Sequence, residues 1–234
     1  MLHARSHGGL NLQPAAHSRC LLDQSLCERL LSCAPSREDL RAVVLAGIIA
    51  VLWRDDSPNP VPIPGVRKDD FVRLATRYLG PSGETIAARS VPGASHPADG
   101  RQREFGDLLR LFLDHSTVVS EDTEWLARAI ATACLGNNHL WQDLGVPSRR
   151  VVSQLLVDYF TSLAQRNTSD MRWKKFFYKQ LCERADIKLC KAPSCAECVD
   201  YDLCFGPEDG AAHASSENSA GPSIALIMSP SQLL

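Results

Sequence analysis

Four of the nine cysteines of this 234-residue chain lie within fifteen residues near its carboxyl end. Their spacing is Cys190-x4-Cys195-x2-Cys198-x5-Cys204. Side chains only two to five residues apart converge on one centre only if the backbone wraps tightly around it, so we expect this segment to lack regular helix or strand. Clustered thiolates are soft ligands that suit zinc or an iron–sulfur cluster. The segment therefore predicts a metal or iron–sulfur site.

Three kinds of sulfur chemistry compete for this pattern. Residues 1–19 lack the apolar core of a secretory signal, which indicates a reducing cytoplasm and argues against structural disulfides. Four thiolates can close a structural zinc site, but such sites usually have two Cys-x2-Cys pairs and this chain has one. The first three cysteines match the opening of plant-type iron–sulfur ligation, although the fourth comes earlier than in that fold. We favour an iron–sulfur cluster, with zinc as the alternative.

The overall composition describes an ordinary globular protein. The hydrophobic content is 44% and the formal net charge is −2, which gives no electrostatic preference for nucleic acid. No apolar run approaches the roughly 18 residues of a membrane span. The longest apolar run, residues 42–53, is better explained as a core helix. We therefore expect neither nucleic acid nor a membrane as a partner.

Apolar residues recur at three- and four-residue spacing along most of the chain, which is typical of amphipathic helices. No segment alternates convincingly with period two. The predicted fold class is all-α, a single bundle of about seven helices with an irregular C-terminal cysteine-rich loop at residues 190–204. The helices are expected at about residues 21–31, 36–52, 70–79, 105–112, 120–135, 147–163 and 170–184.

The helical domain is expected to cover residues 19–208. Residues 1–18 and 209–234 have few apolar anchors and are expected to be disordered. Four prolines in residues 54–68 forbid a helix and predict an extended surface connection. Residues 81–100, rich in Gly, Ser, Pro and Ala, predict a mobile loop or an insertion.

Aromatic and basic residues interleave in residues 171–179, and acidic residues follow, with no basic residue between Cys195 and Asp209. We expect the aromatic rings to pack the helix on the bundle and the cations to face water or a partner protein. Two alternatives are nucleic-acid binding and the attraction of a small oxyanion towards the thiolates by Lys174 and Lys175.

Two stretches carry a resemblance to a known family. The sequences MRWKKFFYKQLCE (171–183) and CKAPSCAECVDYDLCFGPE (190–208) closely resemble the NifQ family of nitrogen-fixation proteins. Two upstream stretches, REFGDLL (103–109) and HLWQDLG (139–145), are similar to the same family. The resemblance spans about residues 25–209.

The resemblance implies a specific role. Proteins of this kind carry an iron–sulfur cluster, of the 4Fe–4S type or as a mixed Mo–3Fe–4S centre, and take up molybdenum that arrives as molybdate. They supply it for assembly of the iron–molybdenum cofactor of nitrogenase, together with the nitrogenase iron protein and a cofactor scaffold protein. The residues that match the family's ligand pattern are Cys190, Cys195, Cys198 and Cys204.

Two further residues are ambiguous. Cys182 is either a spare cluster ligand or a buried residue at the helix end. His139 is either a molybdenum ligand or a helix cap. The remaining cysteines lie on helical faces beside leucines, and we expect small core residues without chemistry at Cys20, Cys27, Cys33 and Cys134.

Other function classes remain open from the sequence. One is a small iron–sulfur electron-transfer protein, and another is a zinc-stabilised interaction module. We do not expect this protein to be an enzyme. The sequence shows no paired carboxylates, nucleophile–base pair or phosphate-binding loop on the secondary structure that such a site requires.

Overall fold

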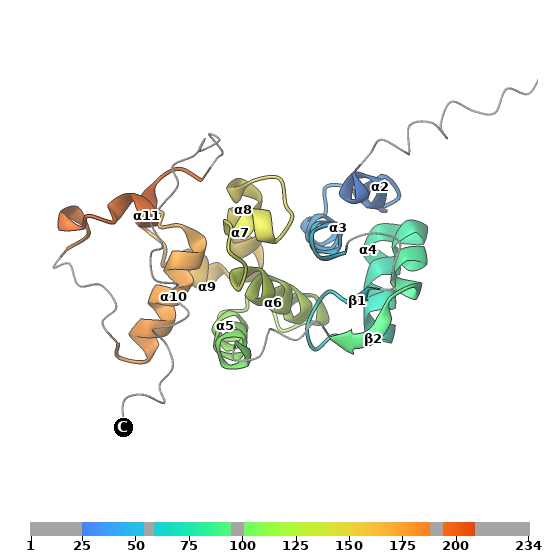
Figure 1. Cartoon of the computed structure of the whole chain (residues 1–234), viewed down its shortest axis with the longest axis horizontal. Helices are drawn as coiled ribbons and strands as arrows, with labels where there is room; N and C mark the ends of the chain where they lie inside the picture. Colours follow the sequence, from blue (N-terminus) through green and yellow to red (C-terminus); the bar gives the residue numbers. More distant parts are fainter. Residues whose placement is uncertain (1–24, 54–58, 95–100, 188–193, 209–234) are drawn as a thin grey trace, which may run out of the picture.

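The computed structural model describes residues 25–53, 59–94, 101–187 and 194–208. Nearly all regular structure in these ranges is helical, so the predicted all-α class is confirmed (Figure 1). The helices are α2 (Leu26–Ser32), α3 (Leu40–Leu52), α4 (Lys68–Ala88), α5 (Gln102–Asp114), α6 (Glu121–Cys134), α7 (Leu140–Asp143), α8 (Arg149–Tyr159), α9 (Thr161–Ala164), α10 (Trp173–Arg184) and α11 (Tyr201–Phe205). Residues 1–18 and 209–234, which we expected to be disordered, lie outside the described ranges.

The described residues hold more helices than the seven or so that periodicity predicts. The additional helices are short: α7 and α9 have four residues each, and α11 has five. One turn of helix carries too few apolar positions to show a 3.6-residue period, so such elements leave no periodic signal in the sequence.

Helix α3 forms the centre of the N-terminal half. It is buried on nearly every side, with Leu45 and Ile49 fully buried, whereas Leu52 at its C-terminal end is exposed. Asp39 caps this helix, which begins at Leu40 rather than at residue 36 as expected. The Asp39 carboxylate accepts a hydrogen bond from the Arg41 N–H and pairs with the Arg41 guanidinium at 2.7 Å, which lowers the pKa of Asp39.

Helix α4 contradicts the loop that we expected to begin at residue 81. The backbone breaks at Gly80 (φ 63°, ψ −150°) and then resumes as helix from Pro81 to Ala88. Proline is well tolerated in the first turn of a helix, because its missing N–H would have no partner there. Gly80 lies so close to α2 that an added Cβ would be 2.5 Å from the Cys33 carbonyl oxygen. The composition of residues 81–88 therefore reflects a tight corner between two helical segments.

In its described part, residues 59–67, the proline-rich connection is extended only over two residues and then bends and turns, and residues 61–64 are buried instead of lying at the surface. Strand β1 (Pro60–Val61) pairs in parallel with β2 (Val91–Ala94). Val61 and Ile63 are 1% and 0% exposed and join the core. Prolines exclude a helix but do not exclude burial, since their rings are apolar, and this part of the prediction was wrong. Residues 54–58 lie outside the described ranges.

Aromatic rings join α10 to the rest of the bundle. Phe177 meets Phe112 of α5 edge-on at 4.9 Å between ring centroids, and Phe112 meets Phe160 at 5.4 Å. Trp173 stacks on Phe177 at 5.8 Å. These contacts confirm that the aromatic residues of 171–179 pack the helix. Within the described ranges, no helix has the length and apolar character needed to cross a membrane.

Candidate metal centre

The described part of the cysteine-rich segment runs from residue 194 to residue 208, so Cys190 lies outside it. Cys195 is exposed, and Cys198 and Cys204 are partly exposed. A 3₁₀ turn covers Cys195–Glu197, and the Cys198 N–H donates to the Cys195 carbonyl at 3.2 Å. Cys204 lies within α11, so our expectation of a wholly irregular segment was wrong. The longer gap before Cys204 accommodates one helical turn.

The described thiols do not converge. Among the described residues, no three His, Cys, Asp or Glu side chains are arranged to hold a metal ion. The donor set itself suits an iron–sulfur cluster, because it consists of accessible thiols rather than oxygen ligands. The four-cysteine ligand set therefore remains a prediction from the sequence.

The far end of the segment is fixed to the start of α10 by Arg172. The Arg172 N–H donates to the Cys204 carbonyl at 2.7 Å. The guanidinium of the same residue donates to the carbonyls of Gly206 at 3.0 Å and Pro207 at 3.2 Å. These bonds hold the backbone of Cys204 and of the residues that follow it.

A buried ion pair completes this attachment. The side chain of Glu208 is only 3% exposed and accepts from Arg149 of α8 at 2.5 Å. Arg149 also donates to the Asp170 carboxylate at 2.6 Å and to the carbonyls of Asp170 and Met171. We call Arg149, Arg172 and Glu208 the arginine anchor. Sequence reasoning missed it, although Glu208 is the last residue of the stretch that resembles the family.

His139 lies beside the arginine anchor. It occupies the N-cap position of α7, where its backbone N–H donates to the Gln142 side chain at 3.0 Å. Its Nδ1 is 3.8 Å from the Glu208 carboxylate. This position fits the helix-cap interpretation, and the alternative role as a molybdenum ligand stays a prediction.

The other cysteines differ in exposure. Cys182 is 2% exposed within α10, and burial raises the pKa of its thiol. Burial also raises the pKa of Cys134, to about 12. Cys33 was expected in the core, but it is exposed at the end of α2, and hydrogen bonds with Ser82 and Ser32 lower its pKa. Cys20 lies outside the described residues.

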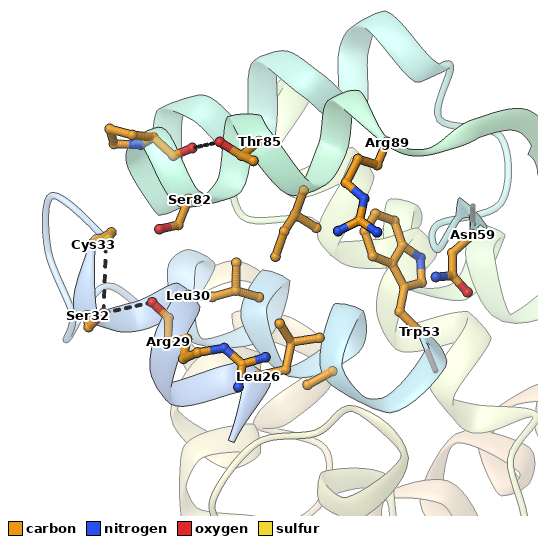
Figure 2. Close-up of a pocket in the computed structure, with 13 residues that line it drawn as sticks. Leu26, Arg29, Leu30, Ser32, Cys33, Trp53, Asn59, Ser82, Thr85 and Arg89 are labelled. Atoms are coloured by element: carbon orange, nitrogen blue, oxygen red, sulfur yellow. Dashed lines mark hydrogen bonds between the residues drawn. The ribbon is translucent and has the colours of Figure 1, made fainter. Parts of the chain in front are cut away.

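Cys33 stands at the rim of a groove of about 880 Å³ between α2, α3 and α4 (Figure 2). Leu26, Leu30 and Trp53 supply much of its apolar lining. In Figure 1 this region lies at the opposite end of the molecule from α11. The groove is therefore separate from the predicted ligands.

These exposures predict which thiols react in the folded, metal-free protein. Iodoacetamide is expected to modify Cys33 and Cys195 first, and Cys134 and Cys182 roughly a hundredfold more slowly, because the thiolate is the nucleophile and burial suppresses it. A more alkaline buffer should accelerate the exposed thiols and leave Cys134 protected, since its pKa is raised to about 12. Mass spectrometry of tryptic peptides measures the order. Rapid native modification of Cys182 would contradict the packing of α10.

The stretches that resemble the family meet around α10. Tyr178 donates a hydrogen bond to Glu104 of α5, and Lys174 forms a 2.5 Å ion pair with Asp143 of α7. Lys174 also donates to the Gly136 carbonyl at 2.9 Å, and its side chain is only 16% exposed. We expected the cations to face water or a partner protein, but Lys174 and Arg172 bind groups of this chain instead. Because Asp143 neutralises Lys174, this lysine gives little support to the attraction of an oxyanion.

The fold and the site together define an all-α protein that carries a cysteine-rich segment on its surface, anchored at one end to α8 and α10. The sequence model of the NifQ family matches residues 44–206. The chain belongs to the NifQ family, and the resemblance found in the motifs is confirmed. The name of this family, NifQ, connects the chain with nitrogen fixation.

Individual relatives agree with this assignment. Protein NifQ of Azotobacter vinelandii is 46% identical over 108 residues, which cover 46% of this chain and 55% of that protein. Protein NifQ of Rhodobacter capsulatus is 38% identical over 141 residues, covering 57% of this chain and 78% of the relative. Protein NifQ of Klebsiella pneumoniae is 43% identical over 89 residues, covering 37% and 53%. The chain thus spans about half the length of the Azotobacter and Klebsiella proteins. No solved structure matches the chain.

Proposed function

We propose that this protein is a molybdenum carrier that supplies molybdenum for assembly of the nitrogenase iron–molybdenum cofactor. Its ligands are Cys190, Cys195, Cys198 and Cys204, and they bind an iron–sulfur cluster of the 4Fe–4S type or a mixed Mo–3Fe–4S centre. The observation that carries the proposal is the placement of the described thiols outside the core, on a segment fixed at one end. We also propose that this protein acts as a carrier and not as an enzyme.

The ligand chemistry supports this proposal. Molybdate is a hard oxyanion, and a cofactor in which molybdenum is bound to sulfur requires oxygen ligands to be exchanged for sulfur. Thiolates and cluster sulfide can provide sulfur ligands, and a cage of carboxylates suited to hard cations cannot. Exposed ligands also suit delivery, because the acceptor must approach the metal directly. The acceptors in this proposal are the nitrogenase iron protein and the cofactor scaffold protein.

Anaerobic purification with metal analysis and electron paramagnetic resonance tests the proposed function. We expect a brown protein that contains iron and molybdenum, and we expect Cys198→Ser to abolish both. Cys33→Ser is the matched control, because it removes an exposed thiol at the other end of the molecule and should leave both metals in place.

The alternatives give different results in the same experiment. A colourless protein with one zinc per chain would identify a zinc-stabilised interaction module. A reversible one-electron cluster without molybdenum, and without transfer to an acceptor, would identify an electron-transfer protein. Either result would replace the proposed carrier function.

A further inference from the structure

The cysteine-rich segment presents three large apolar side chains to solvent. Val199 is 98% exposed, Leu203 is 53% exposed and Tyr201 is 47% exposed. They fall within five residues and follow directly after Cys198. We call Val199, Tyr201 and Leu203 the α11 patch. Scattered apolar residues are normal on a protein surface, but a contiguous group typically marks an interaction site.

Val199 lies in the turn before α11, and Tyr201 and Leu203 lie in its exposed first three residues, whereas Cys204 and Phe205 at its end are partly buried. Cys204 and Phe205 pack against the hydrophobic core, and the ring of Phe205 stacks on Tyr201 at 4.6 Å. The Cys204 carbonyl is bound by Arg172. The core therefore accommodates the C-terminal end of α11, and Val199, Tyr201 and Leu203 stay largely in solvent, with one face of the Tyr201 ring covered by Phe205.

Carboxylates surround this patch. Glu197, Asp200 and Asp202 are all exposed, and no lysine or arginine occurs from Cys195 to Glu208. Arg172 approaches this segment from α10, but its guanidinium donates to the carbonyls of Gly206 and Pro207 beyond the patch. The rim of the patch is therefore negative, which favours a partner with a positive surface.

Delivery of a thiolate-bound metal requires contact at this place. In a direct exchange, each metal–sulfur bond of the carrier breaks as a ligand of the acceptor binds, without a change in oxidation state, and the released thiolate takes a proton from water. The two sets of ligands must be within bonding distance of one metal during this exchange. The residues beside Cys198 and Cys204 are therefore covered by the acceptor.

We propose that Val199, Tyr201 and Leu203, rimmed by Glu197, Asp200 and Asp202, form the docking surface for the protein that accepts the metal. The matching surface on the acceptor is an apolar depression bordered by lysine or arginine. This inference rests on the proposed carrier function. A second copy of the chain is a poorer occupant, because it would bring two negative rims together.

Two double variants test the docking surface. Val199→Ser with Leu203→Ser removes the apolar anchors, and Asp200→Lys with Asp202→Lys reverses the rim. Val118→Ser with Val119→Ser is the apolar control, since these valines are 63% and 93% exposed outside the segment. Glu84→Lys, on the exposed side of α4, is the charge control.

Each protein is loaded anaerobically, its iron and molybdenum are measured, and its delivery of molybdenum to the nitrogenase iron protein with the cofactor scaffold is timed. We expect both patch variants to keep the wild-type metal content and spectrum but to deliver about tenfold more slowly, because interface anchors each contribute more than about 1 kcal/mol. Delivery by the wild type should slow as salt is added, and the charge-reversed variant should lose this dependence. The controls should deliver normally.

Three outcomes overturn the inference, and they are distinguishable. Wild-type delivery rates in both patch variants would show that the patch does not dock the acceptor, with the carrier function intact. Loss of iron from the patch variants alone would assign these residues to cluster binding instead. A loaded wild-type protein that delivers no molybdenum would remove the proposed function and this inference with it.

Discussion

Replacing Gly145 by alanine is expected to lower the free energy of unfolding by about 3 kcal/mol. The φ angle of Gly145 is +71°, a conformation that costs a residue with a Cβ about 1–2 kcal/mol. An added Cβ would also lie 2.3 Å from the carbonyl oxygen of Gly47, and such overpacking costs about 1–3 kcal/mol more. The atoms that this Cβ would meet belong to the backbone of Gly47, so no side chain can rotate away to relieve the contact.

Urea or thermal denaturation measures this effect. Gly47→Ala tests the same contact from α3, since its Cβ would lie 2.5 Å from the Gly145 carbonyl oxygen. Gly106→Ala in α5 is the control, because its Cβ would meet nothing within 4 Å and should stabilise the helix by about 0.5–1 kcal/mol. Equal stability of Gly145→Ala and Gly106→Ala would contradict the close approach of α3 to the turn after α7.

This contact shows what the stretch at residues 139–145 does in the fold. Leu140 and Leu144 are buried, and Asp143 pairs with Lys174. Gly145 then allows the chain to pass α3 at backbone contact distance. Three positions of a motif that we used to recognise the family therefore fix α7 and the turn after it in the fold, and Asp143 ties α7 to α10, the helix that precedes the cysteine-rich segment.

The elements that the sequence predicted well have one apolar face and a local cap. Helix α5 buries Phe105, Leu108 and Phe112 as expected. Helix α6, expected at residues 120–135, runs from Glu121 to Cys134, and its N-cap Ser120 accepts a hydrogen bond from the Thr123 N–H. In such helices the signal is local, because spacing and capping residues fall within a few turns of one another.

The elements that the sequence predicted poorly depend on contacts between distant residues. The second half of α4 follows Gly80, whose conformation is required by the neighbouring Cys33 carbonyl of α2. Val61 and Ile63 are buried because other elements cover them, which proline content does not reveal. Cys33 was placed in the core because it follows leucines, but it lies past the last turn of α2.

The same distinction applies to the candidate site. Spacing alone identified the cysteines, since their pattern is contained within fifteen residues. The arginine anchor joins Arg149 to Glu208, which are 59 residues apart, and no local pattern predicts such a pair. Cys190 lies outside the described residues, so its position relative to the other thiols stays a prediction.

Replacing Arg149 by methionine is expected to release the anchored end of the cysteine-rich segment. Removing one partner of a buried ion pair leaves an uncompensated charge and costs about 3–5 kcal/mol. Glu208 would keep His139, whose Nδ1 is 3.8 Å from its carboxylate. Since the segment can detach locally, we expect the loss to appear as faster amide exchange, by about a hundredfold, at Arg172 and Gly206, whose N–H groups donate to Cys204 and Asp202.

Hydrogen-exchange mass spectrometry measures this release in the metal-free protein, so the result does not depend on cluster binding. Adding Glu208→Leu to Arg149→Met should restore much of the protection, because an apolar pair of similar volume often replaces a buried ion pair without loss. Arg150→Met is the control, because Arg150 is the exposed neighbour on the same helix. Unchanged exchange at Arg172 and Gly206 in Arg149→Met would show that Arg172 alone holds the segment and that the buried pair contributes little to its position.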